Sequence, residues 1–402
     1  MTDTGIQRST DWPAIIVLFL GGLVAAMQFA KVAPVMELVG GELGLDPVAS
    51  GFAVSILGLV GILFAITVGA IVSAIGPQRG LLIALFGGAV IAGLGALAPT
   101  GVTFLVSRFC EGFSHLLIVV CAPALMAALA APKDKPVALA IWGCFFGLGF
   151  AVASAAAPII VPLGGWRGFL LCHAAAMLVI GLLVMLLLAR SKLEDQRGGF
   201  PGVKTIAAAH AALFRERAPL LLALTFCAYT IQFLATLTFL TLYLGTEGQW
   251  RPASVGSFMA FASFVSLIFT LSAGFLARWG VTLFQGFAAA FAGLAVTATI
   301  IFGFHPGAPV LVAAVLVMMA CFGLLPGFAF ASVPQVAPEA RIAALTYSAI
   351  ALFGNVGTFL GTPIFAASRE MTGWWGGAIF IAAMSAVGTA LAALLSSLPA
   401  RR

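Results

Sequence analysis

The chain has 402 residues, of which 62% are hydrophobic and only 8% are charged. Soluble proteins carry about 25% charged residues, so this composition excludes an ordinary soluble enzyme and a disordered chain. A membrane-crossing helix needs about 20 apolar residues, so twelve of them use about 240 residues and leave no room for a sizeable soluble domain. The formal net charge of +6 comes from basic residues between apolar runs, which indicates membrane topology rather than nucleic-acid binding.

Long apolar runs separated by short polar segments predict an all-α polytopic membrane protein with twelve transmembrane helices. One long polar stretch, 190–217, separates the sixth run from the seventh. We therefore expect an N-terminal six-helix bundle (1–189), a cytoplasmic linker (190–217) with a short helix near 203–214, and a C-terminal six-helix bundle (218–402). The runs cover 13–38, 48–74, 80–98, 101–131, 137–163, 167–189, 218–245, 253–277, 281–304, 308–335, 341–368 and 373–397.

Lysine and arginine residues are distributed unevenly over the predicted loops. Of the 19, 14 lie on the side of the N-terminus, while Arg167, Arg251 and Arg369 lie on the other side. The remaining two, Lys31 and Arg108, lie inside predicted spans. Basic residues favour the cytoplasmic side, so the sequence predicts a multi-pass protein of the cell inner membrane, surrounded by lipid, with both termini in the cytoplasm.

Corresponding residues recur in the two predicted bundles at a nearly constant offset. Two parallel six-helix repeats are typical of transporters with a central site between the halves. The recurring pairs are Pro13 and Pro219 (206 residues apart), Gln28 and Gln232 (204), Gly69 and Gly274 (205), and Gly165 and Gly373 (208).

Two motifs carry a family resemblance. The loop 69–79 (GAIVSAIGPQR) is similar to a GxxxDRxGRR motif, although Ser73 and Ala74 replace its Asp and Arg. The stretch 108–115 (RFCEGFSH) is similar to an RxxxG motif. Through these motifs the sequence resembles the major facilitator superfamily over essentially its whole length. The resemblance implies a twelve-helix transporter for a small-molecule substrate and links Arg108 to proton coupling. In the family, the charged residues of the loop hold the cytoplasmic side closed, and Ser73 and Ala74 cannot make those charge contacts.

Three other segments resemble cyanate-permease-type members of the superfamily: 142–149, 165–167 and 352–365. The second and eighth spans lack the arginines that nitrate carriers keep there, and oxalate and monocarboxylate carriers also use an eighth-span arginine. The fifth span lacks the Gly-Pro pair of the antiporter motif, which disfavours drug export without excluding it.

Arg108, Glu111 and His115 share one face of the predicted fourth helix, because they stand at i, i+3 and i+7. Charges inside a bilayer are costly, so each is a functional candidate. Protonation of Glu111 would free Arg108 to hold a substrate anion, and His115 would add a group that titrates near neutral pH. The alternative is a structural ion pair, with His115 merely hydrogen-bonded.

Lys31 lies 18 residues beyond Pro13, about 27 Å along an ideal helix, in the outer part of the same half as Arg108. Two cations near one carboxylate leave a positive potential that suits an anionic ligand. The alternative is that Lys31 extends to the outer surface or pairs with Glu37, which we expect at the end of the span.

Five uncharged polar residues complete the predicted substrate site: Gln28, Gln232, Tyr229, Tyr347 and Asn355. Paired amides in equivalent spans would hydrogen-bond a substrate from both halves, and the tyrosines would line the cavity. The alternative role for the amides is hydrogen bonding between helices.

The sequence offers no signature of catalysis or of a cofactor. It has no GxxxxGK[ST] motif, no metal-ligand spacing and no nucleophile–base set. His173 is expected to pack within the sixth span, Tyr243 to lie at the outer interface, and His305 to have no role. We therefore predict a monomeric transporter without metal or cofactor rather than an enzyme.

The function that these observations favour is proton-coupled import of a small anionic or zwitterionic organic solute by alternating access. One alternative is export of amphipathic or drug-like compounds by proton antiport, because the second half is rich in phenylalanine and poor in charge. Another is a membrane sensor or assembly factor built on a transporter fold.

Overall fold

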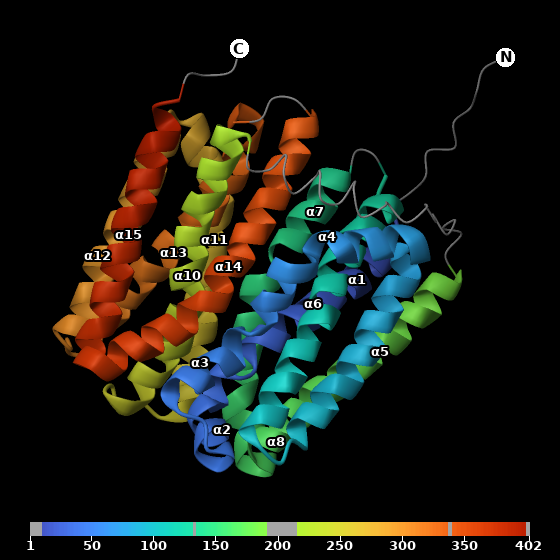
Figure 1. The fold of residues 1–402 in the computed structure, drawn as a ribbon, viewed down its shortest axis with the longest axis horizontal. Coiled ribbons are helices and arrows are strands. Elements are labelled where there is room, and N and C mark those ends of the chain that lie inside the picture. The colour runs from blue at the N-terminus through green and yellow to red at the C-terminus, as the bar shows by residue number, and fades with distance from the viewer. Residues whose placement is uncertain (1–9, 132–133, 191–214, 337–339, 399–402) are drawn as a thin grey trace.

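The chain folds into helices that form two bundles side by side (Figure 1). The structure is a computed structural model that describes residues 10–131, 134–190, 215–336 and 340–398. The first bundle holds α1 to α8 and the second holds α10 to α15. The predicted linker 190–217, with its short helix near 203–214, lies almost wholly outside the described residues.

The first half contains the first six spans, and three of these spans are interrupted. The first span is α1 with the 3-10 helix η1 and α2, the second is α3 with α4, and the fifth is α7 with the first part of α8. The helices are α1 (Trp12–Ala30), η1 (Ala33–Val35), α2 (Met36–Leu43), α3 (Pro47–Ser55), α4 (Leu57–Ile75), α5 (Pro77–Ala96), α6 (Gly101–Leu129), α7 (Lys135–Gly143) and α8 (Phe145–Arg190).

The second half is more regular, and one short π-helix, η2, extends its third span. Its helices are α10 (Arg217–Thr246), α11 (Pro252–Arg278), α12 (Leu283–Ala298), η2 (Thr299–Gly303), α13 (Ala308–Val336), α14 (Ala340–Thr372) and α15 (Trp374–Ser396).

The described part of the chain contains the twelve predicted spans. By length and composition, ten helices are long and apolar enough to cross a membrane, or eleven when the bent pair α3 and α4 counts as one span. The twelfth span is part of α8, because Gly165, with a φ of 64°, kinks α8 and separates it into two helices. Glycine adopts this left-handed conformation without the strain that a side chain would cause. The all-α, two-bundle fold predicted from sequence is therefore confirmed.

The start of α1 and the end of α15 lie on the same face of the molecule, toward the top of Figure 1. We call this the terminal face, and the face that carries the turns at Gly44, Gly165 and Gly373 the opposite face. An even number of spans between the first and last helices requires this arrangement.

The internal repeat appears on the opposite face as the same contact in each half. In the first half, the Trp166 indole Nε1 donates to Glu42 Oε2 at 2.6 Å. In the second half, the Trp374 indole Nε1 donates to Glu247 Oε1 at 2.9 Å. An arginine guanidinium also lies over each ring, at 4.4 Å in the first half and 4.3 Å in the second. These two Trp–Glu contacts join the first span of each half to its sixth.

The halves meet where α8 packs on α11 and where α14 crosses α3 and α4. At the second crossing, Ser55 Oγ donates to the Phe359 carbonyl at 2.8 Å, and Thr362 Oγ1 donates to the Gly51 carbonyl at 2.9 Å. A side chain at Gly51 would lie 3.0 Å from the backbone of Pro363. Small residues therefore bring the two backbones together, as is common between membrane helices.

Candidate functional site

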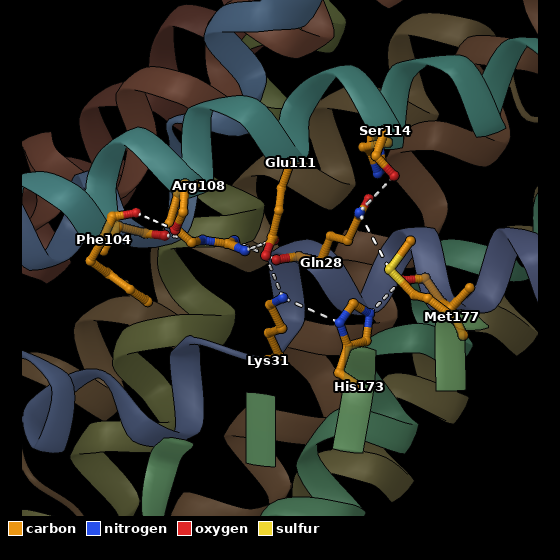
Figure 2. Close-up of polar contacts among 12 residues, drawn as sticks. Gln28, Lys31, Phe104, Arg108, Glu111, Ser114, His173 and Met177 are labelled. Carbon is orange, nitrogen blue, oxygen red and sulfur yellow. Dashed lines mark hydrogen bonds and ion pairs between the residues drawn. The ribbon is translucent and has the colours of Figure 1, made fainter. Parts of the chain in front are cut away.

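Three buried charged side chains meet inside the first half. Lys31 at the end of α1, and Arg108 and Glu111 on α6, are all 0% exposed, and Figure 2 shows their side chains pointing toward one another. We call these three residues the ionic cluster. They are all the buried lysine, arginine and acidic side chains among the described residues, so the described part of the second half contains no counterpart.

Glu111 joins the two cations. Its Oε1 accepts from Lys31 Nζ at 2.7 Å, and its Oε2 accepts from Arg108 Nη1. One carboxylate thus serves two full positive charges, and the ionic cluster carries one excess positive charge when Glu111 is ionised. Burial makes this arrangement costly unless each charge is paired and hydrogen-bonded.

Arg108 also closes the ends of two interrupted spans. Its Nε donates to the Ala53 carbonyl at 2.9 Å, and its Nη2 donates to the Gln28 carbonyl. These oxygens belong to the last turns of α3 and α1, where backbone carbonyls lack partners within the helix. A cation at a helix C-terminus is also stabilised by the helix dipole. The guanidinium therefore links the breaks in the first and second spans to Glu111.

His173 joins this group, which the sequence analysis did not predict. Its Nδ1 lies 3.2 Å from Lys31 Nζ and its Nε2 lies 2.9 Å from the Val24 carbonyl. Since an ammonium donates and a carbonyl accepts, Nδ1 accepts and Nε2 carries the hydrogen, which is the neutral imidazole. We expected His173 only to pack in the sixth span. Its sequence neighbours are apolar, so no local signal pointed to Lys31, 142 residues away.

Lys31 is buried and pairs with Glu111, which excludes the alternative environments considered for it in the sequence analysis. The side chain neither reaches the surface nor pairs with Glu37, which is exposed at the start of α2. Its ammonium is held by α6 and by the sixth span in α8. Lys31 and Arg108 do converge, as expected, but their partners all lie in the first half rather than across the central interface.

Gln28 lies one turn before Lys31 and is also fully buried. Its Nε2 donates to Ser114 Oγ at 3.0 Å and lies 3.7 Å from Met177 Sδ. Its Oε1 has no hydrogen-bond partner among the described residues. The side chain therefore ties α1 to α6, while one buried acceptor is left over.

Gln232, its counterpart in α10, makes different contacts. Its Nε2 donates to the Ala228 carbonyl at 2.6 Å, and its Oε1 accepts from Ser385 Oγ on α15 at 3.0 Å. The two amides thus each bond within their own half. No hydrogen bond joins Gln28 to Gln232 in this structure, and their joint action on a substrate stays a prediction.

His115 is separate from the ionic cluster. It is half-buried, its Nδ1 lies 2.9 Å from the Ala25 carbonyl, and its ring meets the Phe29 ring edge-on at 4.9 Å. The i+4 spacing places it one turn beyond Glu111 on the helix, and the structure shows no contact between the two side chains.

The two predicted cavity tyrosines belong to a row of aromatic rings, which we call the aromatic row. Tyr347, which is 47% exposed, stacks on Phe330 at 6.3 Å. The row continues through Phe226 and Tyr229 to Phe233, with centroid separations of 5.2 to 5.7 Å. Phe233 then faces rings of α8 in the first half at 6.4 and 6.5 Å. The aromatic row thus crosses from the second half to the first.

Asn355 lies at the crossing of α14 with α4, where a side chain added at Gly61 would collide with it. Its Nδ2 donates to the Ala351 carbonyl of its own helix at 2.8 Å. Asn355 therefore lies between the halves.

Gly112, which completes the RxxxG motif, is required for close packing. A Cβ there would lie 2.6 Å from Val60 Cγ2 and 2.9 Å from the Leu57 carbonyl. The motif thus joins a buried guanidinium to a point where α6 touches the backbone of α4. Among the described residues, no group of three or more His, Cys, Asp or Glu side chains is placed to hold a metal ion.

Two helical bundles that repeat the same arrangement, with a buried ionic cluster in one of them, are typical of a multi-pass membrane transporter. The family model of the Major Facilitator Superfamily matches residues 18–362. The chain therefore belongs to the Major Facilitator Superfamily and is a secondary transporter of a small-molecule substrate rather than an enzyme. No curated protein matches the chain by sequence.

Two solved structures are similar in fold. A bacterial homolog to the human lysosomal transporter Spinster, in an inward-facing and occupied conformation, has a TM-score of 0.78 at 13% identity, covering 96% of each chain. A mutant of the nucleoside transporter NupG has a TM-score of 0.74 at 16% identity, covering 95% of this chain and 99% of that one. At these identities the likeness concerns the fold. The comparisons support the superfamily and not a cyanate-permease-type subgroup.

Proposed function

We propose that the protein imports a small anionic or zwitterionic organic solute together with protons. The observation that carries this proposal is the sharing of Glu111 between Lys31 and Arg108 in a fully buried site. A carboxylate that changes charge there alters the balance of the whole ionic cluster, because the low-dielectric interior does not screen it.

The charge states give the coupling its direction. With Glu111 ionised, the ionic cluster carries one excess positive charge. Protonation raises the excess to two, which strongly favours an incoming anion. Release of the anion restores the attraction of the cations for an ionised Glu111 and so promotes loss of the proton. Solute and proton therefore bind favourably together and leave together, which is symport.

Arg108 connects this chemistry to movement of the helices. Its guanidinium holds the last turns of α1 and α3 as well as Glu111. When Glu111 takes up a proton, Arg108 loses its charged partner, and the bonds that fix the two breaks are redistributed. Rocking of one half against the other then exposes the solute site alternately at the two faces.

The terminal face is the cytoplasmic face in this proposal. The described basic residues support it, because basic residues favour the cytoplasm and more of them lie on the terminal face than on the opposite face. The terminal face has Arg79, Lys135, Arg190, Arg215, Arg217, Arg278 and Arg341, and the opposite face has Arg167, Arg251 and Arg369. The protein works as a monomer in the lipid of the cell inner membrane. The solute passes between the halves along the aromatic row, near His115 and Asn355, with Gln28, Gln232, Tyr229 and Tyr347 as candidate contacts.

A second candidate is export of amphipathic or drug-like compounds by proton antiport. The aromatic row favours it, because stacked rings accept apolar solutes of varied shape and the described buried residues of the second half include no charge. Export would use the same Glu111, with solute and proton competing for the site instead of binding together.

Uptake into proteoliposomes tests the proposal. Liposomes with an inward proton gradient are given a mixed panel of organic acids, amino acids and hydrophobic cations, and the accumulated compounds are measured by mass spectrometry. We expect gradient-dependent accumulation of an anion or zwitterion that Arg108→Ala and Lys31→Ala abolish. Arg251→Ala is the matched control, because Arg251 is exposed on the opposite face.

The results separate the candidates. Accumulation of hydrophobic cations when the proton gradient is reversed to point outward, with no accumulation of acids under the inward gradient, would favour the antiport alternative. Wild-type uptake rates in both Arg108→Ala and Lys31→Ala would contradict a role of the ionic cluster in transport. Solute binding without flux would point to a sensor.

A further inference from the structure

A pocket of about 440 Å³ opens on the opposite face, away from the ionic cluster. Both halves form it: η1, α2 and the fifth-span part of α8 lie on one side, and the end of α10 and the start of α11 on the other. Its volume lies within the range of small-molecule sites, about 300–1,000 Å³. Because its walls belong to different halves, its shape depends on their relative position.

The lining of the pocket is apolar apart from a few groups. Trp250, Leu242 and Val161 supply large apolar surfaces. Two threonines in the wall are already satisfied, since Thr241 Oγ1 and Thr246 Oγ1 donate to carbonyls of their own helix at 2.8 and 3.1 Å. The wall thus offers a ligand mainly apolar contact, as an amphipathic molecule requires.

Glu37 is the charged residue of the lining. It stands in the first turn of α2, is exposed, and makes no ion pair or hydrogen bond with another described residue. A carboxylate at the edge of an apolar pocket attracts a cationic head group, and the pairing strengthens where water is partly displaced.

We propose that this pocket binds an amphipathic organic amine, with its apolar body against Trp250 and its ammonium at Glu37. The site is distinct from the ionic cluster, and the proposal does not depend on which solute crosses the membrane. A neutral or anionic compound of the same shape gains the apolar contact but not the ion pair, so charge complementarity selects the amine.

Occupancy of the pocket also bears on the ionic cluster. Ala33, Pro34 and Val35 of η1 form part of the pocket wall, and η1 begins two residues after Lys31. A ligand that wedges between η1 and α10 holds the two halves in the arrangement seen here. We therefore expect such an amine to inhibit transport without competing at the ionic cluster.

Binding of a matched series to the protein in zwitterionic lipid nanodiscs tests this site. The probes are 4-phenylbutylamine, 4-phenylbutan-1-ol and 4-phenylbutyrate, measured by isothermal titration calorimetry with empty nanodiscs subtracted. We expect saturable binding of the amine, about fivefold tighter than the alcohol, as for an ion pair at a solvent-accessible site. Glu37→Gln should lower the affinity for the amine to that for the alcohol.

Two further variants complete the test. Thr246→Trp fills the pocket from an exposed rim position and should abolish binding of the amine and the alcohol. Glu370→Gln removes an exposed carboxylate outside the pocket, near the same face, and should leave amine binding unchanged. The proposal is overturned if Glu37→Gln retains wild-type affinity for the amine, if the butyrate binds as tightly as the amine, or if no probe binds saturably.

Discussion

Arg108 Nε donates a 2.9 Å hydrogen bond to the carbonyl oxygen of Ala53, in the last turn of α3. The fourth span is thereby bonded to the second span immediately before its 49° bend. The same guanidinium reaches the end of α1 and Glu111. An arginine, with five donors spread over a planar fork, reaches three separate acceptors at once, whereas a lysine has its three donors on one nitrogen atom.

Arg108→Lys should therefore destabilise the protein although the charge is kept. Loss of the bonds to Ala53 and Gln28 leaves two buried carbonyls unsatisfied, at a cost of about 1–3 kcal/mol each. We expect a clear fall in melting temperature in detergent and slower transport. Arg251→Lys, at an exposed position, should change neither the melting temperature nor the transport rate. An unchanged melting temperature in Arg108→Lys would show that the bonds from Arg108 to the Ala53 and Gln28 carbonyls do not stabilise the protein.

Gly112→Ala should destabilise the packing of α6 on α4. The added methyl group would meet the Leu57 carbonyl at 2.9 Å, and a backbone atom moves less readily than a flexible side chain. Overpacking of this kind costs about 1–3 kcal/mol. The control is Gly87→Ala in α5, where nothing lies within 4 Å of the new Cβ, so thermal denaturation should show no loss. Equal melting temperatures in the two variants would argue against the close approach.

The twelve spans were predictable because length and apolarity alone define a helix that crosses a bilayer. Two of the three breaks were not: Ile56 and Cys144 interrupt apolar runs without any polar or proline signal at the break itself. The break in the first span does carry such signals, Lys31 and Pro34, although we expected one continuous span there. Gly165 was recognised only as a landmark of the repeat, whereas its positive φ, which divides α8, depends on the tertiary structure. Periodicity therefore located the spans, while packing decided where each one bends.

Trp166→Phe and Trp374→Phe should have similar small effects, because the two Trp–Glu contacts are equivalent in the two halves. Each variant keeps an aromatic ring and loses one indole hydrogen bond to a carboxylate. Since Glu42 is about half exposed, with 51% of its side chain accessible, water competes for the carboxylate and we expect only a small fall in melting temperature in either variant. Thermal melting checks this, with Trp375→Phe as the neighbouring control. A much larger loss in one half alone would contradict the equivalence.

Labelling of single serine-to-cysteine variants should reveal the orientation. Ser254 is exposed at the start of α11 on the opposite face, and Ser396 is exposed at the end of α15 on the terminal face. In intact cells, a membrane-impermeant maleimide should label Ser254→Cys above the wild-type background and Ser396→Cys only after lysis. The reverse pattern would place both termini outside and overturn the orientation proposed from the basic residues.

The candidate site was predictable only in part. Helical spacing brought Arg108 and Glu111 together, since i and i+3 share a face whatever the surroundings. Lys31 joined them because its burial in an apolar span demanded a partner, but the choice of Glu111 over Glu37 depends on how α1 ends. His173 and His115 show the limit most clearly: the histidine on the same helix face stays apart, and the one from a distant span makes the contact.

The central claim is that Glu111 carries the proton, and Glu111→Gln tests it most directly. The purified protein is reconstituted into liposomes that contain a pH-sensitive dye, and the solute that the wild type accumulates is added outside. Glu111→Asp and Glu370→Gln serve as controls. We predict that Glu111→Gln still exchanges solute for solute but neither moves protons nor accumulates solute under a proton gradient. Glu111→Asp should retain coupling at a lower rate, and Glu370→Gln should behave as the wild type. Solute-driven proton flux at the wild-type rate in Glu111→Gln would contradict the account.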